Sequence, residues 1–191
     1  MNSRDQILSR VGQHRYDSPL PDLPSFDPPE GSVIDAFGRA VETTAGKYVN
    51  CYADEVAAHI GRIHSRADRI ASTTGLVNGT VDLRDDSGSQ VVGSIELFVC
   101  MAELGVAENG AVWITDSRLR SRAALFATQH LAVVVRRDSI VWNMHDAYRR
   151  ITINKEGFGV FVCGPSKTAD IEQSLVIGAH GPRSLTVFAI E

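Results

Sequence analysis

The chain has 191 residues, of which 43% are hydrophobic and 22% are charged. These values are ordinary for a globular protein, and a chain of this length forms about one domain with a full core. Its 19 Lys and Arg residues against 23 Asp and Glu residues give a net charge of -4, which argues against a polybasic nucleic-acid module. No apolar run approaches the ~20 residues of a membrane helix, and the N-terminus lacks the apolar stretch of a secretory signal. We therefore expect a cytoplasmic protein without a membrane span.

The three cysteines are Cys51, Cys100 and Cys163, and they are far apart in the sequence. Zinc and iron–sulfur sites usually show short Cys-x-x-Cys spacings, and this chain has none. We therefore expect no metal site in this chain and interpret the cysteines as small buried apolar residues. Cys163 has an alternative interpretation as a reactive thiol, because it ends a predicted strand beside a glycine loop.

The N-terminal region differs in composition from the rest of the chain. Residues 3–6 form a capping-box pattern, and Ile7, Leu8 and Val11 follow at helical spacing. Five of the seven prolines lie within residues 14–31, which predicts an extended connector. We divide the chain into an N-terminal helix and Pro-rich arm, 1–31, and an α/β domain, 32–191. The helix either docks on the domain or a partner, or is a frayed tail.

The remaining elements alternate between helices and strands. In the first half we predict a helix at 32–45 that Ser32 caps, a strand at 47–52, a helix from Asp54, a short strand within 69–77, and at 95–101 a strand or helix that periodicity does not separate. In the second half we predict strands at 104–107, 111–114, 130–135, 158–163 and 184–190, and helices at 140–148 and 168–178. Asn109-Gly110 marks a hairpin between the first two of these strands. The pattern indicates a three-layer α/β fold with a mostly parallel sheet flanked by helices and an antiparallel hairpin insertion.

The segment 158–178 is a predicted strand, loop and helix. In open α/β sheets, ligands bind beyond the carboxyl ends of strands, and a helix N-terminus there attracts anions. Ser166, Lys167 and Thr168 add hydroxyl groups and a cation to the expected site. Asp170 and Glu172 instead suit a helix cap, a ribose contact or a base. The alternative is that Ser166 or Thr168 is only a helix cap. Pro165-Ser166 stands where a Walker loop needs Lys-Ser/Thr, and no dinucleotide fingerprint occurs.

The stretch Gly164-Pro-Ser-Lys-Thr-Ala-Asp-Ile-Glu172, followed by Gly178-Ala-His-Gly-Pro-Arg183, resembles the C-terminal signature of the LUD-domain family, in its lactate utilization protein C branch. Residues 104–112 are similar to the family's Ile-Ala-Glu-Thr-Gly stretch, with Asn109 in place of the usual Thr. The resemblance covers about residues 32–191, and its strong motifs lie after 104. The Pro-rich N-terminus is not part of the signature.

The resemblance implies a fold similar to the ribose-phosphate isomerase and CoA-transferase superfamily. It implies an accessory subunit of a system that oxidises L-lactate to pyruvate, which binds a small anionic ligand, redox partner proteins, or both. Iron–sulfur clusters are then expected in the partners and no cofactor in this chain, and an oligomer is compatible with the sequence. The alternatives are an acyl- or CoA-handling transferase-like enzyme and a nucleotide-binding cyclo-ligase-like enzyme.

The resemblance also implies which residues form the site. In the related transferase fold a glutamate serves as nucleophile, which makes Glu108 the catalytic candidate; its alternative role is a structural or ligand-orienting carboxylate. His180 is either a ligand contact or a turn-anchoring residue that caps the preceding helix. We expect the hairpin turn and the loop 164–168 to converge at the carboxyl edge of the sheet. The candidate ligand-binding residues are Asn109, Gly110, Gly164, Pro165, Ser166, Lys167, Thr168, Asp170, Glu172, His180 and Arg183.

Three other groups invite functional interpretations. His145 and Asp146 are adjacent on a predicted helix and do not face each other, so they form no dyad. His59 and His64 are five residues apart, which does not place them on one helix face as metal ligands. The arginines form a basic cluster that is either a solvated face or a surface for an anionic ligand or acidic partner. They are Arg118, Arg120, Arg122, Arg136 and Arg137.

Overall fold

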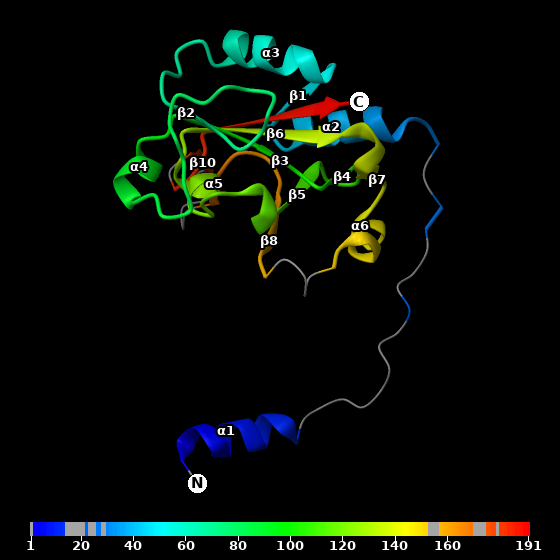
Figure 1. The fold of residues 1–191 in the computed structure, drawn as a ribbon. Coiled ribbons are helices and arrows are strands. Elements are labelled where there is room, and N and C mark those ends of the chain that lie inside the picture. Colours follow the sequence, from blue (N-terminus) through cyan, green and yellow to red (C-terminus); the bar gives the residue numbers. More distant parts are fainter. Residues whose placement is uncertain are drawn as a thin grey trace.

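A computed structural model describes residues 2–13, 22, 26–27, 30–152, 157–169, 175–178 and 180–191. Within them the chain forms an α/β fold with a parallel sheet, a mixed sheet, a two-stranded antiparallel sheet and flanking helices (Figure 1). The predicted fold class is therefore confirmed at the level of its layers and its mostly parallel sheet. None of the helices in these ranges is long and apolar enough to cross a membrane.

Sheet A is parallel and has the strand order β1-β11-β6-β3-β2. Its strands are β1 (Lys47–Asn50), β2 (Ile70–Ser72), β3 (Leu97–Met101), β6 (His130–Arg136) and β11 (Ser184–Ile190). The central strands carry near-continuous apolar runs because helices or a second sheet cover both faces. The run Leu131–Val135 is buried throughout. The ambiguous segment 95–101 is resolved as strand β3.

The helices are α1 (Ser3–Gly12), α2 (Val33–Thr43), α3 (Val56–Ile63), α4 (Ser89–Gly93), α5 (Ala124–Ala127) and α6 (Met144–Arg150), with 3₁₀ turns at Ala53–Glu55, Asp116–Arg118 and Arg137–Ser139. Helix α2 begins as predicted, because the Ser32 hydroxyl accepts the backbone N–H of Asp35 at 3.3 Å. Helix α1 is also present, but Asn2 caps it through the N–H of Asp5, so the predicted capping box at Ser3 is wrong.

Two hydrophobic clusters fill the two faces of sheet A. On one face, Val56 and Ile60 of α3 pack with Val99, Val134 and Phe188. The other face packs against α2, α5 and sheet B. Its members include Phe37, Val41, Phe98, Val112, Ile114, Leu125, Leu131, Val133 and Val187. Figure 1 shows α3 above the sheet, with α5 and the sheet B strands on the opposite side.

Sheet B has the order β7-β4-β5-β8. It contains β4 (Leu104–Val106), β5 (Ala111–Thr115), β7 (Ile140–Val141) and β8 (Gly159–Val162). The predicted hairpin is confirmed, since β4 and β5 pair antiparallel with Gly105 opposite Val112. Two predictions need correction. The helix expected at 140–148 begins only at Met144, because Ile140 and Val141 pair with β4. The strand predicted at 158–163 is β8, but it is half-buried and pairs antiparallel with β5 in sheet B, so it lies outside the parallel sheet.

The helix predicted at 168–178 is wrong at both of its ends, and residues 170–174 lie outside the described residues. Residues Lys167–Ala169 form strand β9, which pairs antiparallel with β10 (Leu175–Ile177). Thr168, Val176 and Ile177 are β-branched, and such residues lose side-chain freedom in a helix but fit a strand. Strand β9 therefore stands where the sequence predicted the helix N-terminus of an anion site after Gly164.

The three apolar side chains of α1 are all exposed. Ile7, Leu8 and Val11 are 61%, 55% and 64% exposed. Phe26, farther along the arm, contacts the ring of His145 on α6 with centroids 5.2 Å apart. The division of the chain at residues 31 and 32 stays a prediction.

Candidate ligand-binding pocket at the amino edge of the sheet

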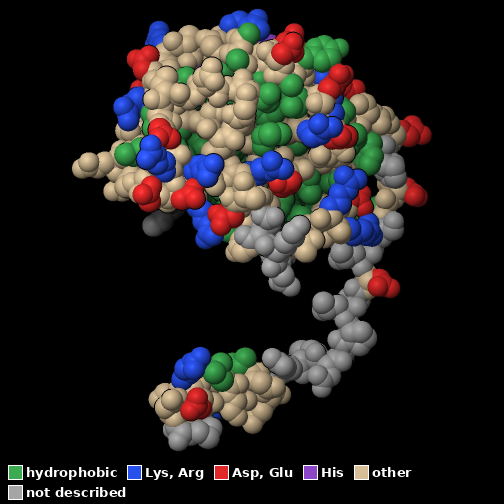
Figure 2. All heavy atoms as spheres, in the orientation of Figure 1, with side chains coloured by type: hydrophobic (Ala, Val, Ile, Leu, Met, Phe, Trp, Pro, Cys, Tyr) green, Lys and Arg blue, Asp and Glu red, His purple; other side chains and the backbone are tan. Residues whose placement is uncertain are grey.

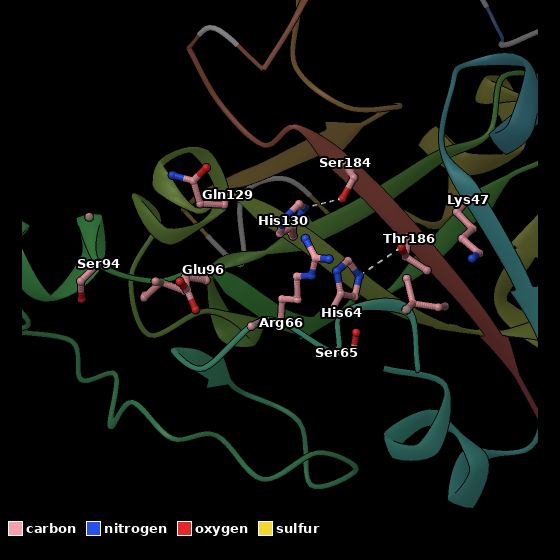
Figure 3. Close-up of a pocket in the computed structure, with 14 residues that line it drawn as sticks. Lys47, His64, Ser65, Arg66, Ser94, Glu96, Gln129, His130, Ser184 and Thr186 are labelled. Carbon is pink, nitrogen blue, oxygen red and sulfur yellow. Dashed lines mark hydrogen bonds between the residues drawn. The ribbon is translucent and has the colours of Figure 1, made fainter. Parts of the chain in front are cut away.

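A cavity of about 690 Å³ opens at the amino ends of the parallel strands, under the C-terminal end of α3. The start of β1, β6 and β11 each contributes a polar residue, and the loop after α3 closes one side (Figure 3). The polar and charged lining residues are Lys47, His64, Ser65, Arg66, Ser94, Glu96, Gln129, His130, Ser184 and Thr186. This is the opposite edge of the sheet from the one expected from the sequence.

Two histidines lie side by side in this cavity. His64 is the C-terminal cap of α3 and His130 is the first residue of β6; their ring centroids are 5.2 Å apart. The Nδ1 of His130 lies 2.8 Å from the Ser184 hydroxyl, and the Nε2 of His64 lies 3.4 Å from the hydroxyl of the buried Thr186. Figure 3 shows both contacts reaching from the rings to strand β11.

The electrostatics of the cavity favour neutral imidazoles. Burial, and then the nearby His130 and Lys47, lower the pKa of His64 from 6.5 to about 4. Burial and the charge of Arg183 lower the pKa of His130, against an opposing effect of Glu96. A neutral imidazole both donates and accepts a hydrogen bond, so the pair offers polar contacts to a ligand without bringing charge of its own.

The charged residues of the lining divide into two roles. The Glu96 carboxylate accepts the backbone N–H groups of Asp68 and Arg69 at 2.7 and 3.0 Å, which anchors the loop after α3 to the start of β3. These two bonds lower the pKa of Glu96. Lys47 and Arg66 have exposed side chains at the rim. The cavity therefore combines two cations with hydroxyl and imidazole groups, a donor set that suits a small anion.

The C-terminal signature borders this cavity. A smaller hollow of about 380 Å³ is lined by residues 126–129 together with Gly178, His180, Gly181 and Arg183. Gln129 lines both spaces, and its carbonyl accepts the N–H of Arg183 at 2.8 Å. His180 is exposed and follows no helix within the described residues, so its alternative role as a helix cap is wrong.

The hairpin turn and the loop 164–167 lie together, but not where the sequence predicted. The Cys163 thiol donates to the Asn109 carbonyl at 3.1 Å, and the Lys167 ammonium donates to the Thr44 carbonyl at 2.6 Å. Thr44 caps the C-terminal end of α2, which leads into the amino end of β1. The expected meeting place at the carboxyl edge is therefore wrong. Cys163 is exposed, so its interpretation as a buried residue is also wrong, whereas Cys51 and Cys100 are buried as predicted.

Two glycines allow this close approach. Gly110 and Gly164 have positive φ angles of 73° and 71°. A Cβ atom on Gly110 would lie 2.6 Å from the Val41 nitrogen, and one on Gly164 would lie 2.3 Å from the Thr44 carbonyl oxygen. Both positions therefore serve backbone packing against α2 in the structure.

The remaining predicted site residues are placed as follows. The Glu108 carboxylate accepts the N–H of Met144 at 2.9 Å, at the start of α6. The Asn109 side chain accepts the N–H of Ala111 at 3.0 Å, which closes the hairpin turn. Pro165 is buried, and the N–H of Ser166 donates to the Pro182 carbonyl at 2.9 Å. Asp170 and Glu172 lie outside the described residues, and for Thr168 only the backbone, in β9, is described.

The basic cluster is an ion-paired surface. Each of its arginines has an acidic partner: Arg118 with Glu103, Arg120 with Asp85, Arg122 with Asp116, Arg136 with Asp138, and Arg137 with Glu191. Figure 2 shows Lys and Arg side chains interspersed with Asp and Glu on the visible face. The solvated-face interpretation accounts for these contacts.

Sequence reasoning did not assign five polar residues of the lining to a ligand site: Lys47, His64, His130, Ser184 and Thr186. One signal was present in the sequence. The buried runs of β6 and β11 each begin with a polar residue, His130 and Ser184, which face each other in register. Polar residues at the starts of two buried parallel strands indicate that polar side chains gather at the amino edge of the sheet, where a ligand site could form.

The architecture defines an α/β protein whose parallel sheet packs against a mixed sheet. A crystal structure of a DUF162 family protein from Deinococcus radiodurans shares this fold, with a TM-score of 0.66 and 18% identity over 83% of this chain and 96% of that one. The sequence model of the LUD domain family matches residues 42–190, and the chain belongs to that family. Curated relatives are lactate utilization protein C, which confirms the branch predicted from the sequence.

Two of these relatives illustrate the extent of the similarity. The protein from Shouchella clausii is 31% identical over 92 residues, covering 46% of this chain and 40% of the relative. The protein from Halalkalibacterium halodurans is 26% identical over 137 residues, covering 66% of this chain and 59% of the relative. The matched regions thus span less than two thirds of the relatives' own length.

Proposed function

We propose that this protein is an accessory component of a lactate utilization system and binds a small carboxylate, of the 2-hydroxy or 2-oxo acid class, in the amino-edge cavity. The name of its curated relatives supports the system. The observation that carries the ligand class is a single cavity lined by two histidines, by the hydroxyl groups of Ser184 and Thr186 that they contact, and by the cations Lys47 and Arg66. The same proposal includes partner proteins that hold iron–sulfur clusters and accept the electrons released when L-lactate is oxidised to pyruvate.

The chemistry of the cavity matches such a ligand. Lys47 and Arg66 offset the carboxylate charge, and Arg supplies paired donors that fit a carboxylate plane. The imidazole and hydroxyl groups of His64, His130 and Ser184 provide the donors and acceptors that a 2-hydroxyl or 2-oxo group requires. The ligand would therefore be held by its charge at the rim and oriented by hydrogen bonds further in.

Isothermal titration with L-lactate, pyruvate and acetate tests the proposal. We expect L-lactate or pyruvate to bind more tightly than acetate, because acetate lacks the second oxygen-bearing group. Lys47→Ala and Arg66→Ala should each weaken binding by roughly 10-fold, equivalent to about 1.4 kcal/mol. Arg136→Ala removes an arginine paired with Asp138 at the other end of β6 and is the matched control.

The result that contradicts the proposal is specific. If none of the three acids binds, or if binding is unchanged in both Lys47→Ala and Arg66→Ala, the cavity is not a carboxylate site. Copurification of the full chain with the iron–sulfur proteins of the same system tests the partner part separately. Failure of that copurification would leave the ligand result standing and would contradict only the assembly.

A further inference from the structure

A second cluster of functional side chains lies at the carboxyl end of β1, away from the amino-edge cavity. The Cys51 thiol, the Glu55 carboxylate and the His59 imidazole each offer one donor atom, and the three atoms lie within 4.8 Å of one another. Cys51 directly follows β1, Glu55 ends the 3₁₀ turn, and His59 lies on α3. The spacing of four residues between Glu55 and His59 places both on one face at the start of the helix.

Each member of this cluster also contacts another part of the fold. Cys51 is 5% exposed, and its N–H donates to the Ala189 carbonyl at 3.2 Å. One oxygen of Glu55 accepts the N–H of Tyr52 at 2.8 Å, which leaves its other oxygen available. The ring of His59 packs near Phe188 with centroids 6.4 Å apart. These contacts keep the three residues near one another before any ion binds.

The geometry is close to what a tetrahedral ion requires. Zinc bonds of about 2.0–2.3 Å place neighbouring ligand atoms roughly 3.2–3.8 Å apart. Because the three donor atoms already lie within 4.8 Å, rotation of the half-exposed His59 and exposed Glu55 side chains suffices to close the gap. The exposure of Glu55 also gives an ion a path from solvent.

The charges balance as well. A thiolate and a carboxylate carry two negative charges, which one divalent cation neutralises when the histidine is neutral. Arg137, which donates to the Cys51 carbonyl at 3.0 Å, is already paired with Glu191 at 3.0 Å. Glu191 therefore offsets the positive charge of Arg137, so that Arg137 does not strongly oppose the binding of a cation by the cluster.

We infer that Cys51, Glu55 and His59 bind one Zn²⁺ ion, with a fourth position filled by water. The sulfur, nitrogen and oxygen donor set is typical of zinc, and three protein ligands with one solvent ligand is the pattern of an open zinc site. The site lies at the carboxyl edge of the parallel sheet, where α/β proteins commonly bind ligands. The sequence-based expectation of no metal site rested on the absence of a Cys-x-x-Cys spacing and on the separation of His59 from His64, and it did not combine Cys51 with Glu55 and His59.

Titration of the chelator-treated full-length protein with Co²⁺ tests the site, because cobalt reports its ligands by absorption. We expect one equivalent of Co²⁺ to produce a thiolate-to-cobalt charge-transfer band and the intense visible bands of tetrahedral coordination, and Zn²⁺ to displace it. Cys51→Ser should abolish the charge-transfer band. Glu55→Gln and His59→Ala, at more exposed positions that tolerate substitution, should weaken Co²⁺ binding at least about 100-fold.

Cys163→Ser is the matched control, since Cys163 is the exposed cysteine and lies outside the cluster. It should leave both the band and its stoichiometry unchanged. The inference is overturned if no charge-transfer band forms, if the band survives Cys51→Ser, or if Cys163→Ser removes it. Circular dichroism of each variant before titration separates lost binding from lost folding, and Glu55→Gln and His59→Ala keep the test decisive if Cys51→Ser does not fold.

Discussion

The imidazoles of His64 and His130 lie with their centroids 5.2 Å apart, one at the end of α3 and the other at the start of β6. Two protonated rings at this separation would repel each other, and burial disfavours the charge on either one. The arrangement therefore keeps the pair neutral at neutral pH. Lys47 and Arg183 add positive charge nearby and act in the same direction.

This relationship predicts a pH-dependent loss of stability that His64 causes. The pKa of His64 falls from 6.5 to about 4 on folding, so the unfolded chain binds a proton more readily than the folded one. The free energy of unfolding should decrease as the pH falls from about 6.5 towards 4, with no further contribution of His64 below both values. His64→Asn should reduce this decrease.

Urea unfolding at pH 7 and pH 5 measures the effect. His145→Asn makes the same substitution on α6, outside the cavity, and should retain the His64 contribution. An equal pH dependence in wild type and His64→Asn would contradict the neutral pair. Stability that rises as the pH falls from 7 to 5 would contradict the sign of the pKa shift.

The features that could be predicted from the sequence are those that depend on short stretches of neighbouring residues. The apolar run Leu131–Val135 predicts a buried parallel strand, and Asn109-Gly110 predicts a hairpin; both occur. The predicted helix at 168–178 failed because the strand pairing of Lys167–Ala169 with Leu175–Ile177 prevailed over an apparent helical spacing of apolar residues. The amino-edge cavity was missed because its contacts are remote in sequence. The hydroxyl of Thr186 and the ring of His64, for example, are 122 residues apart.

The turn at Gly110 is expected to be intolerant of any side chain. Its φ of 73° is unfavourable for other residues, and a Cβ atom would lie 2.6 Å from the Val41 nitrogen. Gly110→Ala should therefore lower the free energy of unfolding by roughly 3 kcal/mol, of which only about 1–2 kcal/mol comes from the backbone angle. Gly157 has a similar φ of 68°, and no described atom lies within 4 Å of its Cβ position. Gly157→Ala should show only the smaller loss, and equal losses in the two variants would contradict the close packing of the hairpin turn against α2.

Helix α3 carries a glycine that the structure does not require. Gly61 has helical backbone geometry, and an added Cβ would meet no described atom within 4 Å. Gly61→Ala should raise the free energy of unfolding by about 0.5–1 kcal/mol, because alanine restricts the unfolded chain and favours the helix. Chemical denaturation checks this expectation. A destabilising effect would show that the exposed face of α3 contacts another part of the protein in solution.

Glu108 has two alternative roles, a structural carboxylate and the nucleophile of an acyl-transferring enzyme, and substitutions can distinguish them. Its carboxylate accepts the N–H of Met144 at 2.9 Å, so it satisfies a free donor in the first turn of α6. Glu108→Ala should lower the free energy of unfolding by about 1 kcal/mol, whereas Glu108→Gln, which keeps an acceptor oxygen, should lower it by less than about 0.5 kcal/mol. Neither variant should change carboxylate binding in the amino-edge cavity. Incubation of the wild-type protein with an acyl-CoA, followed by peptide mass analysis, provides the complementary test. A CoA thioester on Glu108 that is lost in Glu108→Gln would contradict the structural role and would support the transferase interpretation instead.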